Sequence, residues 1–181
     1  MKIKNFSLKD LAFYLSDYLR KKGVDTVLSG GACVSIYTDN KFLSFDLDFV
    51  LSAFDDQKKI KSILGEIGFY EKNRLFMHDD TMYTVDFLPP PLSVGEEPVK
   101  EIAQLKKGNK ILKLLSTTDC VKDRLAAYYY WEDEQSEGQA ILVCLDNQVD
   151  LEKVKRWSKN EGMMDKFNIF KKHLKERMPK S

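Results

Sequence analysis

Apolar positions recur with a helical period that alternates with strand-like runs up to about position 115, and the pattern is purely helical beyond it. Over 7–22, apolar residues return every three or four positions after a Ser7–Asp10 capping box, which predicts a helix. Further helices are predicted over 32–37, 55–67, 119–131, 134–148, 151–159 and 163–177. Strands are predicted over 24–28, 45–51, 69–77, 81–88, 99–105 and 110–115. This order indicates an α/β (α+β) core over 1–115, followed by a helical subdomain over 116–181 that packs on it within one domain.

Length and composition fit one globular domain with a real core. The chain has 181 residues, of which 43% are hydrophobic and 31% charged. No segment approaches the roughly 20 apolar residues that span a bilayer, and the N-terminal sequence MKIKNFSLKD lacks the apolar stretch of a signal peptide. We therefore expect a cytoplasmic protein without membrane contact. Cys33, Cys120 and Cys144 show no C-x-x-C spacing, so we expect buried free thiols rather than a zinc site or disulfides.

Two features of the helical half have more than one interpretation. The formal net charge is only +1, but segment 153–180 carries ten basic residues against three acidic ones. Such a stretch is typical of a phosphate-binding surface and, more commonly, of a solvated helix face. The aromatic run 128–131 (Tyr-Tyr-Tyr-Trp) is consistent with base stacking, with an acceptor cleft or with core packing, which is the commoner case.

The motif Ser29-Gly30-Gly31 directly follows the 24–28 strand and precedes the 32–37 helix. Glycine lets the backbone approach a ligand closely, and the N–H groups at the start of a helix point toward a bound phosphate. The motif therefore predicts an anion site, although a Gly-Gly turn before a helix is also common in proteins that bind no phosphate.

Two aspartates lie side by side on the 45–51 strand. Asp46 and Asp48 are two residues apart and therefore share one face, while Phe45, Leu47 and Phe49 point to the core. Neighbouring like charges are costly, and a divalent cation bound between them would remove that cost. An edge strand with one wet face would also tolerate the pair.

A third aspartate, Asp86, stands alone among large apolar residues of the 81–88 strand, and a buried carboxylate needs a partner. If the two strands are neighbours, Asp46, Asp48 and Asp86 converge. Three carboxylates with open positions suit Mg²⁺ that bridges nucleotide phosphates. The alternative is that the strands are placed differently and the three carboxylates never meet.

The segments LSGGACVSIY, SFDLDFV and TVDFL resemble, in the right order, the motifs of the DNA polymerase beta superfamily of nucleotidyltransferases. The resemblance covers about 24–88 and implies a nucleotidyltransferase fold, with a mixed β-sheet flanked by helices. It further implies that Ser29, Gly30 and Gly31 hold the triphosphate of a nucleotide such as ATP.

The same resemblance implies a role for each aspartate. Asp46 and Asp48 would bind Mg²⁺ or Mn²⁺, and Asp86 would bind one metal and help to deprotonate the attacking hydroxyl. The implied reaction is in-line attack on the α-phosphorus of an NTP with release of pyrophosphate.

Within the superfamily, the sequence is similar to AbiEii-like abortive-infection toxins and related bacterial proteins. These have an R-x-S-x-D-x-D strand and a later K-D motif on a helix. Ser44 matches the serine of that strand and Lys122-Asp123 matches the later motif, which implies that these three residues also bind the nucleotide. Phe42 stands where the family has arginine.

Two classes of function follow. An enzyme would transfer a nucleoside monophosphate to a hydroxyl of tRNA, a protein or a small molecule, as a toxin–antitoxin or phage-defence component or as a relative of antibiotic-modifying enzymes. A degenerate nucleotide-binding module would instead act through a protein partner, like an antitoxin. The three acids and two glycines favour the enzyme, because buried unpaired carboxylates are costly without a metal. Phe42 favours the degenerate module.

Overall fold

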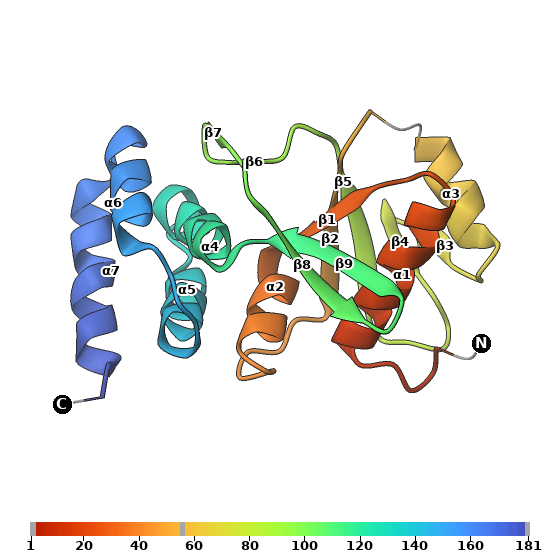
Figure 1. Ribbon diagram of the computed structural model, residues 1–181, viewed down its shortest axis with the longest axis horizontal. Helices are drawn as coiled ribbons and strands as arrows, with labels where there is room; N and C mark the ends of the chain where they lie inside the picture. Colours follow the sequence, from red (N-terminus) through yellow and green to blue (C-terminus); the bar gives the residue numbers. More distant parts are fainter. Residues whose placement is uncertain (1–2, 55–56, 180–181) are drawn as a thin grey trace.

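Figure 1 shows a computed structural model of the chain, which describes residues 3–54 and 57–179. A central sheet separates helices at the two ends of the molecule. The helices are α1 (Leu8–Lys21), α2 (Gly30–Tyr37), α3 (Gln57–Gly65), α4 (Thr117–Trp131), α5 (Glu134–Asp146), α6 (Leu151–Asn160) and α7 (Met164–Arg177). In the figure, α1 and α3 lie at one end and α4–α7 at the other, with α2 between the sheet and α4 and α5.

The sheet is mixed and has seven strands. Their order is β3 (Tyr70–Lys72), β4 (Leu75–Met77), β5 (Thr84–Leu88), β2 (Asp46–Leu51), β1 (Thr26–Ser29), β9 (Lys110–Leu115) and β8 (Ile102–Lys107). Strand β1 runs parallel to β9 and β2 runs parallel to β5, while the other neighbours are antiparallel. Strands β6 (Ser93–Val94) and β7 (Glu97–Pro98) form a separate small hairpin. The two aspartate-bearing strands are therefore neighbours at the centre of the sheet.

The apolar face of β2 and β5 explains why these strands are central. Leu47 and Phe49 are fully buried, as the alternation predicts. The Phe49 ring stacks on Phe87 at 5.9 Å between centroids, and Phe76 of β4 meets Phe87 edge-on at 5.6 Å. Phe45 departs from the prediction because 51% of it is exposed. It lies just before β2 begins, beyond the core, and stacks on Tyr83.

Most of the predicted elements are confirmed, including the Ser7–Asp10 capping box of α1. The prediction of one strand over 69–77 is wrong, because the chain folds back between β3 and β4. Asn73 and Arg74 both have positive φ angles, 53° and 71°, which a tight two-residue hairpin turn requires and which asparagine tolerates. The β6–β7 hairpin was not predicted. The first two positions of the predicted 55–67 helix lie outside the described residues.

The three cysteines are free, as predicted. Cys33 and Cys120 are buried and Cys144 is partly buried. Within the described part of the chain, no helix has both the length and the apolar character needed to cross a membrane.

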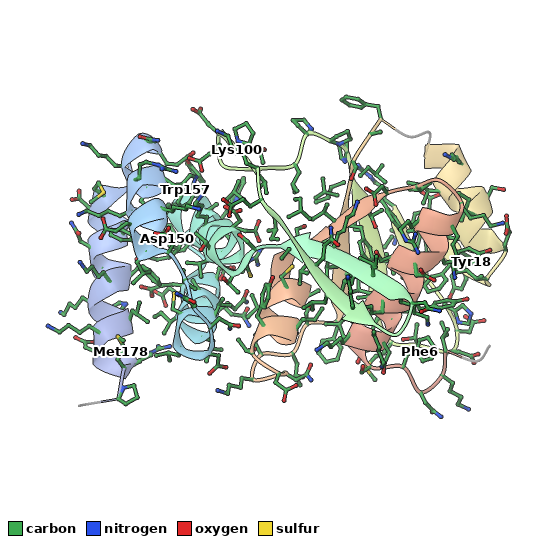
Figure 2. The ribbon with its side chains drawn as sticks, in the orientation of Figure 1. Phe6, Tyr18, Lys100, Asp150, Trp157 and Met178 are labelled. Atoms are coloured by element: carbon green, nitrogen blue, oxygen red, sulfur yellow. The ribbon has the colours of Figure 1, made fainter. Side chains whose placement is uncertain are left out.

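The hydrophobic core continues into the helical end around Trp157 of α6, which is labelled in Figure 2. Trp157 is fully buried, stacks on Tyr129 of α4 at 5.5 Å between ring centroids and donates its indole N–H to the carbonyl of Val94 (3.1 Å). The Tyr129 hydroxyl lies 2.9 Å from the hydroxyl oxygen of Ser158. Within the run 128–131, Tyr129 is therefore a core residue.

We expect Tyr129→Phe to lower the free energy of unfolding by about 1 kcal/mol, because it removes one buried hydrogen bond and leaves the ring in place. The matched control is Tyr128→Phe, since the Tyr128 hydroxyl bonds to no described residue; its expected effect is close to zero. Thermal unfolding measures both. An equal loss in the two variants would contradict the assignment of the Tyr129–Ser158 bond.

Candidate functional site

The structure brings the three predicted aspartates to one face of the sheet. In the parallel pair of β2 and β5, Asp48 lies opposite Asp86, and Asp46 lies opposite Thr84. Residues that lie opposite each other on neighbouring strands share a face, as do residues two apart on one strand. The strand placement on which the site hypothesis depended is therefore correct.

The Ser29–Gly30 step places the start of α2 against Asp48. Ser29 lies opposite Asp48 in the antiparallel β1–β2 pair, and its hydroxyl donates to the Asp48 backbone carbonyl (3.2 Å). Gly30 has a φ of +67°, and a Cβ atom there would lie 2.3 Å from Asp48 Oδ2. Only glycine fits this conformation and this close approach. The backbone that begins α2 thus lies directly beside a carboxylate of the site.

Ser44 shapes the start of β2. Its hydroxyl donates to the Asp46 backbone carbonyl (3.0 Å) and accepts from the Asp46 N–H (3.3 Å). A Cβ atom on Gly31 would lie 3.3 Å from both Ser44 Oγ and a ring carbon of Phe42. Phe42 therefore packs against the glycine motif, where the AbiEii-like family has arginine. Lys41 forms an ion pair with Asp146 (2.5 Å) and supplies no charge there.

The site carries concentrated negative charge. Burial, followed by the charges of Asp46 and Asp86, raises the pKa of Asp48 from 3.8 to about 6. Its carboxylate makes no hydrogen bond or ion pair with a described residue. Asp46 accepts a hydrogen bond from the Thr84 hydroxyl, and Asp86 accepts one from the backbone N–H of Phe87 (2.8 Å). Electrostatic repulsion inside the site, expected from the sequence, is thus a property of the structure.

The carboxylates do not form a finished metal cluster. Across residues 3–54 and 57–179, no group of three or more Asp, Glu, His or Cys side chains is arranged so that it could hold a metal ion. The donor chemistry nevertheless fits a hard divalent cation, which prefers carboxylate oxygens. Asp48 has both oxygens without a described partner, and Asp46 and Asp86 each commit one oxygen to a hydrogen bond. A cation would also neutralise the charge that raises the Asp48 pKa.

Helix α4 supplies an ion pair that faces this charge. The Asp123 carboxylate accepts hydrogen bonds from Nη2 and Nε of Arg124 (2.6 and 3.0 Å), and Arg124 Nη1 donates to Gln139 (3.4 Å). The charge of Arg124 lowers the pKa of Asp48 and that of Asp123 raises it, so both lie within electrostatic reach of the site. Sequence reasoning predicted Asp123 but missed Arg124, whose only signal was its position next to the K-D motif.

Lys122, the other predicted residue of that motif, lies elsewhere. Its side chain is only 5% exposed and donates to Glu97 (2.8 Å) and Asp119 (3.1 Å). Successive residues of an α-helix point about 100° apart, so Lys122 and Asp123 leave α4 in different directions. The ion pairs of Lys122 are with these two acids and not with the aspartates on β2 and β5.

The aromatic run 128–131 divides between core and surface. Tyr129 is buried and Tyr128 is partly buried, whereas Tyr130 and Trp131 are 46% and 82% exposed. The exposed pair remains the part of this run that is accessible to a ligand.

No protein-family model matches the sequence, and no curated protein sequence matches it. Solved structures do match. An antigenic nucleotidyltransferase-like protein from Paracoccidioides brasiliensis has a TM-score of 0.58 at 14% identity, covering 75% of this chain and 74% of that chain. The solution structure of the antibiotic-resistance factor ANT(2'')-Ia has a TM-score of 0.52 at 14% identity, covering 97% of both chains. The crystal structure of ANT(2'')-Ia in complex with adenylyl-2''-tobramycin has a TM-score of 0.50 at 13% identity, covering 87% of this chain and 97% of that chain. The chain therefore has a nucleotidyltransferase fold.

Proposed function

We propose that this protein is a metal-dependent nucleotidyltransferase, which moves a nucleoside monophosphate from an NTP to a hydroxyl group. The observation that carries the proposal is the placement of Asp48 opposite Asp86 on parallel strands, with the Gly30 backbone in contact with Asp48. This arrangement combines a carboxylate site for a cation with backbone N–H groups for phosphates, at one point of a nucleotidyltransferase fold.

Each element has a part in binding the nucleotide. The N–H groups at the start of α2, together with the Ser29 hydroxyl, would bind the triphosphate, because the start of a helix attracts anions. Ser44 holds the backbone around Asp46, so it positions a carboxylate and need not contact the nucleotide itself. Asp123 holds the Arg124 guanidinium within electrostatic reach of the site, and from there Arg124 would orient a phosphate.

Asp46, Asp48 and Asp86 would hold Mg²⁺ or Mn²⁺. When bound, such an ion would supply positive charge that offsets the negative charge developing on the phosphates during transfer. In addition, Asp86 would accept the proton of the attacking hydroxyl, as a carboxylate within reach of the acceptor can do. The hydroxyl oxygen would form a bond to the α-phosphorus while the bond from that phosphorus to the β-phosphate oxygen breaks. Pyrophosphate is therefore the second product.

A small molecule is the acceptor that we favour. The support is the ANT(2'')-Ia structure that contains adenylyl-2''-tobramycin, a nucleotide joined to a small molecule. A tRNA acceptor and a toxin role would instead use the basic segment 153–180, whose lysines and arginines up to Arg177 mostly lie exposed on α6 and α7. A degenerate module that acts through a protein partner is the non-enzymatic alternative.

A calorimetric titration of the four NTPs, with and without Mg²⁺, tests this function. We expect the wild type to bind at least one NTP in a Mg²⁺-dependent manner, and we expect Asp46→Ala/Asp48→Ala to lose that binding. The control is Asp79→Ala/Asp80→Ala, which removes two exposed aspartates from the β4–β5 connection and should bind normally. Binding that survives in Asp46→Ala/Asp48→Ala would contradict the assignment, and no binding by the wild type would favour the partner-dependent module.

A further inference from the structure

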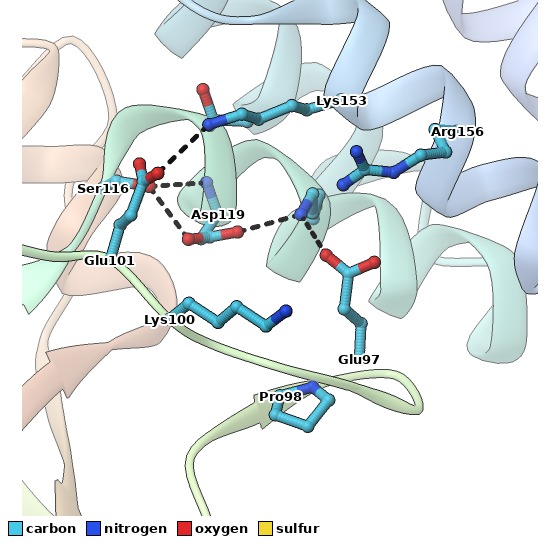
Figure 3. A pocket seen from close by; sticks show the side chains of 10 residues that line it. Glu97, Pro98, Lys100, Glu101, Ser116, Asp119, Lys153 and Arg156 are labelled. Atoms are coloured by element: carbon cyan, nitrogen blue, oxygen red, sulfur yellow. Dashed lines mark hydrogen bonds and ion pairs between the residues drawn. The ribbon is translucent and has the colours of Figure 1, made fainter.

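A cavity that the aspartates on β2 and β5 do not line lies beside α4. It has a volume of about 430 Å³ and opens between α4, α6 and the segment that joins β7 to β8. Figure 3 shows Lys153 and Arg156 of α6 and Lys100 of the connecting segment around it. Lys122 of α4 also lines the cavity. The cavity has a size typical of small-molecule sites.

Two lysines pair with the three carboxylates of this cavity. Glu97 and Asp119 both accept from Lys122, and Glu101 accepts from Lys153 (3.2 Å). Because of its hydrogen bond to Lys122, the pKa of Glu97 is lowered, so Glu97 stays ionised and paired. Lys122 is shared between two acids, and the charges of Arg156 and Lys100 also lower the pKa of Glu97.

The lining has a net positive charge, because its four cationic side chains face three carboxylates. Within the described residues, neither Lys100 nor Arg156 makes a hydrogen bond or an ion pair, and Figure 3 shows both side chains directed toward the space beside Glu97. Lys122 adds a third donor group, since an ammonium has three N–H bonds and its two carboxylate partners take two of them. That ammonium is almost fully buried, so its position is fixed in advance by its surroundings.

We propose that this cavity binds the phosphate group of a small phosphorylated molecule, through Lys100, Arg156 and the buried Lys122. Cationic donors from three separate elements suit a tetrahedral dianion, and charge-assisted hydrogen bonds to phosphate are the strong ones. The remaining volume accommodates the rest of a molecule of sugar size. The proposal goes beyond nucleotidyl transfer, because it concerns different residues and needs no metal.

Titration calorimetry with glucose 6-phosphate, at low ionic strength and without Mg²⁺ or NTP, tests the proposal. We expect the wild type to bind it, and we expect Lys100→Gln/Arg156→Gln to bind it roughly tenfold or more weakly. Both substituted side chains are exposed, so the variant should fold normally. The matched control is Lys155→Gln/Lys159→Gln, which removes two exposed charges from α6 outside the cavity and should bind as the wild type does.

Further arms separate the sources of binding. Glucose should not bind, and inorganic phosphate should bind more weakly than glucose 6-phosphate if the cavity also contacts the sugar. Equal affinities for glucose 6-phosphate and inorganic phosphate would support a site that binds free phosphate through Lys100, Lys122 and Arg156. Asp46→Ala/Asp48→Ala should keep the binding, so that failure of the transferase proposal leaves this result intact. The inference is overturned if the wild type binds neither glucose 6-phosphate nor inorganic phosphate. It is also overturned if Lys155→Gln/Lys159→Gln weakens binding as much as Lys100→Gln/Arg156→Gln does, or if Asp46→Ala/Asp48→Ala abolishes binding.

Discussion

We expect Asp48→Asn to lower the rate of the proposed nucleotidyl transfer by on the order of 10³-fold or more, because it would remove a charged oxygen ligand of the proposed metal. The substitution keeps the shape of the side chain, so the loss reports chemistry and not packing. Pyrophosphate release measures the rate once an acceptor has been identified with labelled NTP. Asp79→Asn, at an exposed turn, is the control and should retain full activity. Transfer that persists in Asp48→Asn would contradict the assignment of the site.

The same variant should be more stable than the wild type when no metal is present. Burial and the neighbouring carboxylates raise the pKa of Asp48 to about 6, so the folded protein holds that proton more tightly than the unfolded chain does. The stability that protonation contributes is therefore present at low pH and is lost as the pH rises from about 4 to about 6. At neutral pH, Asp48→Asn should raise the free energy of unfolding by roughly 1 to 3 kcal/mol, which raises the melting temperature by several degrees.

The pH dependence distinguishes this gain from a general stabilisation. Wild type and variant should have similar stability near pH 4 and should diverge up to about pH 6. Mg²⁺ should stabilise the wild type and leave Asp48→Asn unchanged, since ligand binding to the folded state adds to its stability. A variant that is less stable than the wild type at neutral pH without metal would show that Asp48 has a structural partner.

Gly30→Ala should lower both stability and activity. A left-handed conformation costs an L-residue about 1 to 2 kcal/mol. The new methyl group would also lie 2.3 Å from Asp48 Oδ2, so Asp48 must move. We expect a total loss of roughly 2 to 4 kcal/mol in the free energy of unfolding, together with loss of Mg²⁺-dependent NTP binding.

Gly108→Ala is the matched control for this variant. Gly108 also has a positive φ, +57°, but nothing lies within 4 Å of the position of a Cβ atom. It should therefore lose only the conformational part, about 1 kcal/mol, and should bind NTP normally. Equal losses in stability and binding for the two variants would contradict the contact between Gly30 and Asp48.

The shared face of Asp46 and Asp48 could be predicted because it follows from the local sequence alone. Alternation along β2 places Asp46 and Asp48 on one face whatever the tertiary structure is. The position of Asp86 opposite Asp48 is not local, since it depends on how β2 and β5 pair across the segment that holds α3, β3 and β4. Only the order of the motifs, through the family resemblance, indicated that these strands are neighbours.

A sequence motif does not specify the directions in which its side chains leave a helix, and other parts of the site depended on those directions. The K-D motif implied that Lys122 and Asp123 act at the same place. On the helix their side chains point in different directions, and each bonds to a different partner. Arg124 was missed because its relation to Asp48 arises from the packing of α4 and not from any spacing. The β3–β4 turn was missed because Arg74 is an uncommon residue in the left-handed conformation.

A crystal structure with Mn²⁺ and a non-hydrolysable NTP analogue, in which anomalous scattering locates the metal, shows directly whether the three aspartates bind a metal beside the nucleotide. We expect a Mn²⁺ ion bound by Asp48 and by at least one of Asp46 and Asp86, with phosphates of the nucleotide at the N–H groups that begin α2. A nucleotide bound away from the β1–α2 junction, or a metal that contacts none of these aspartates, would contradict this expectation.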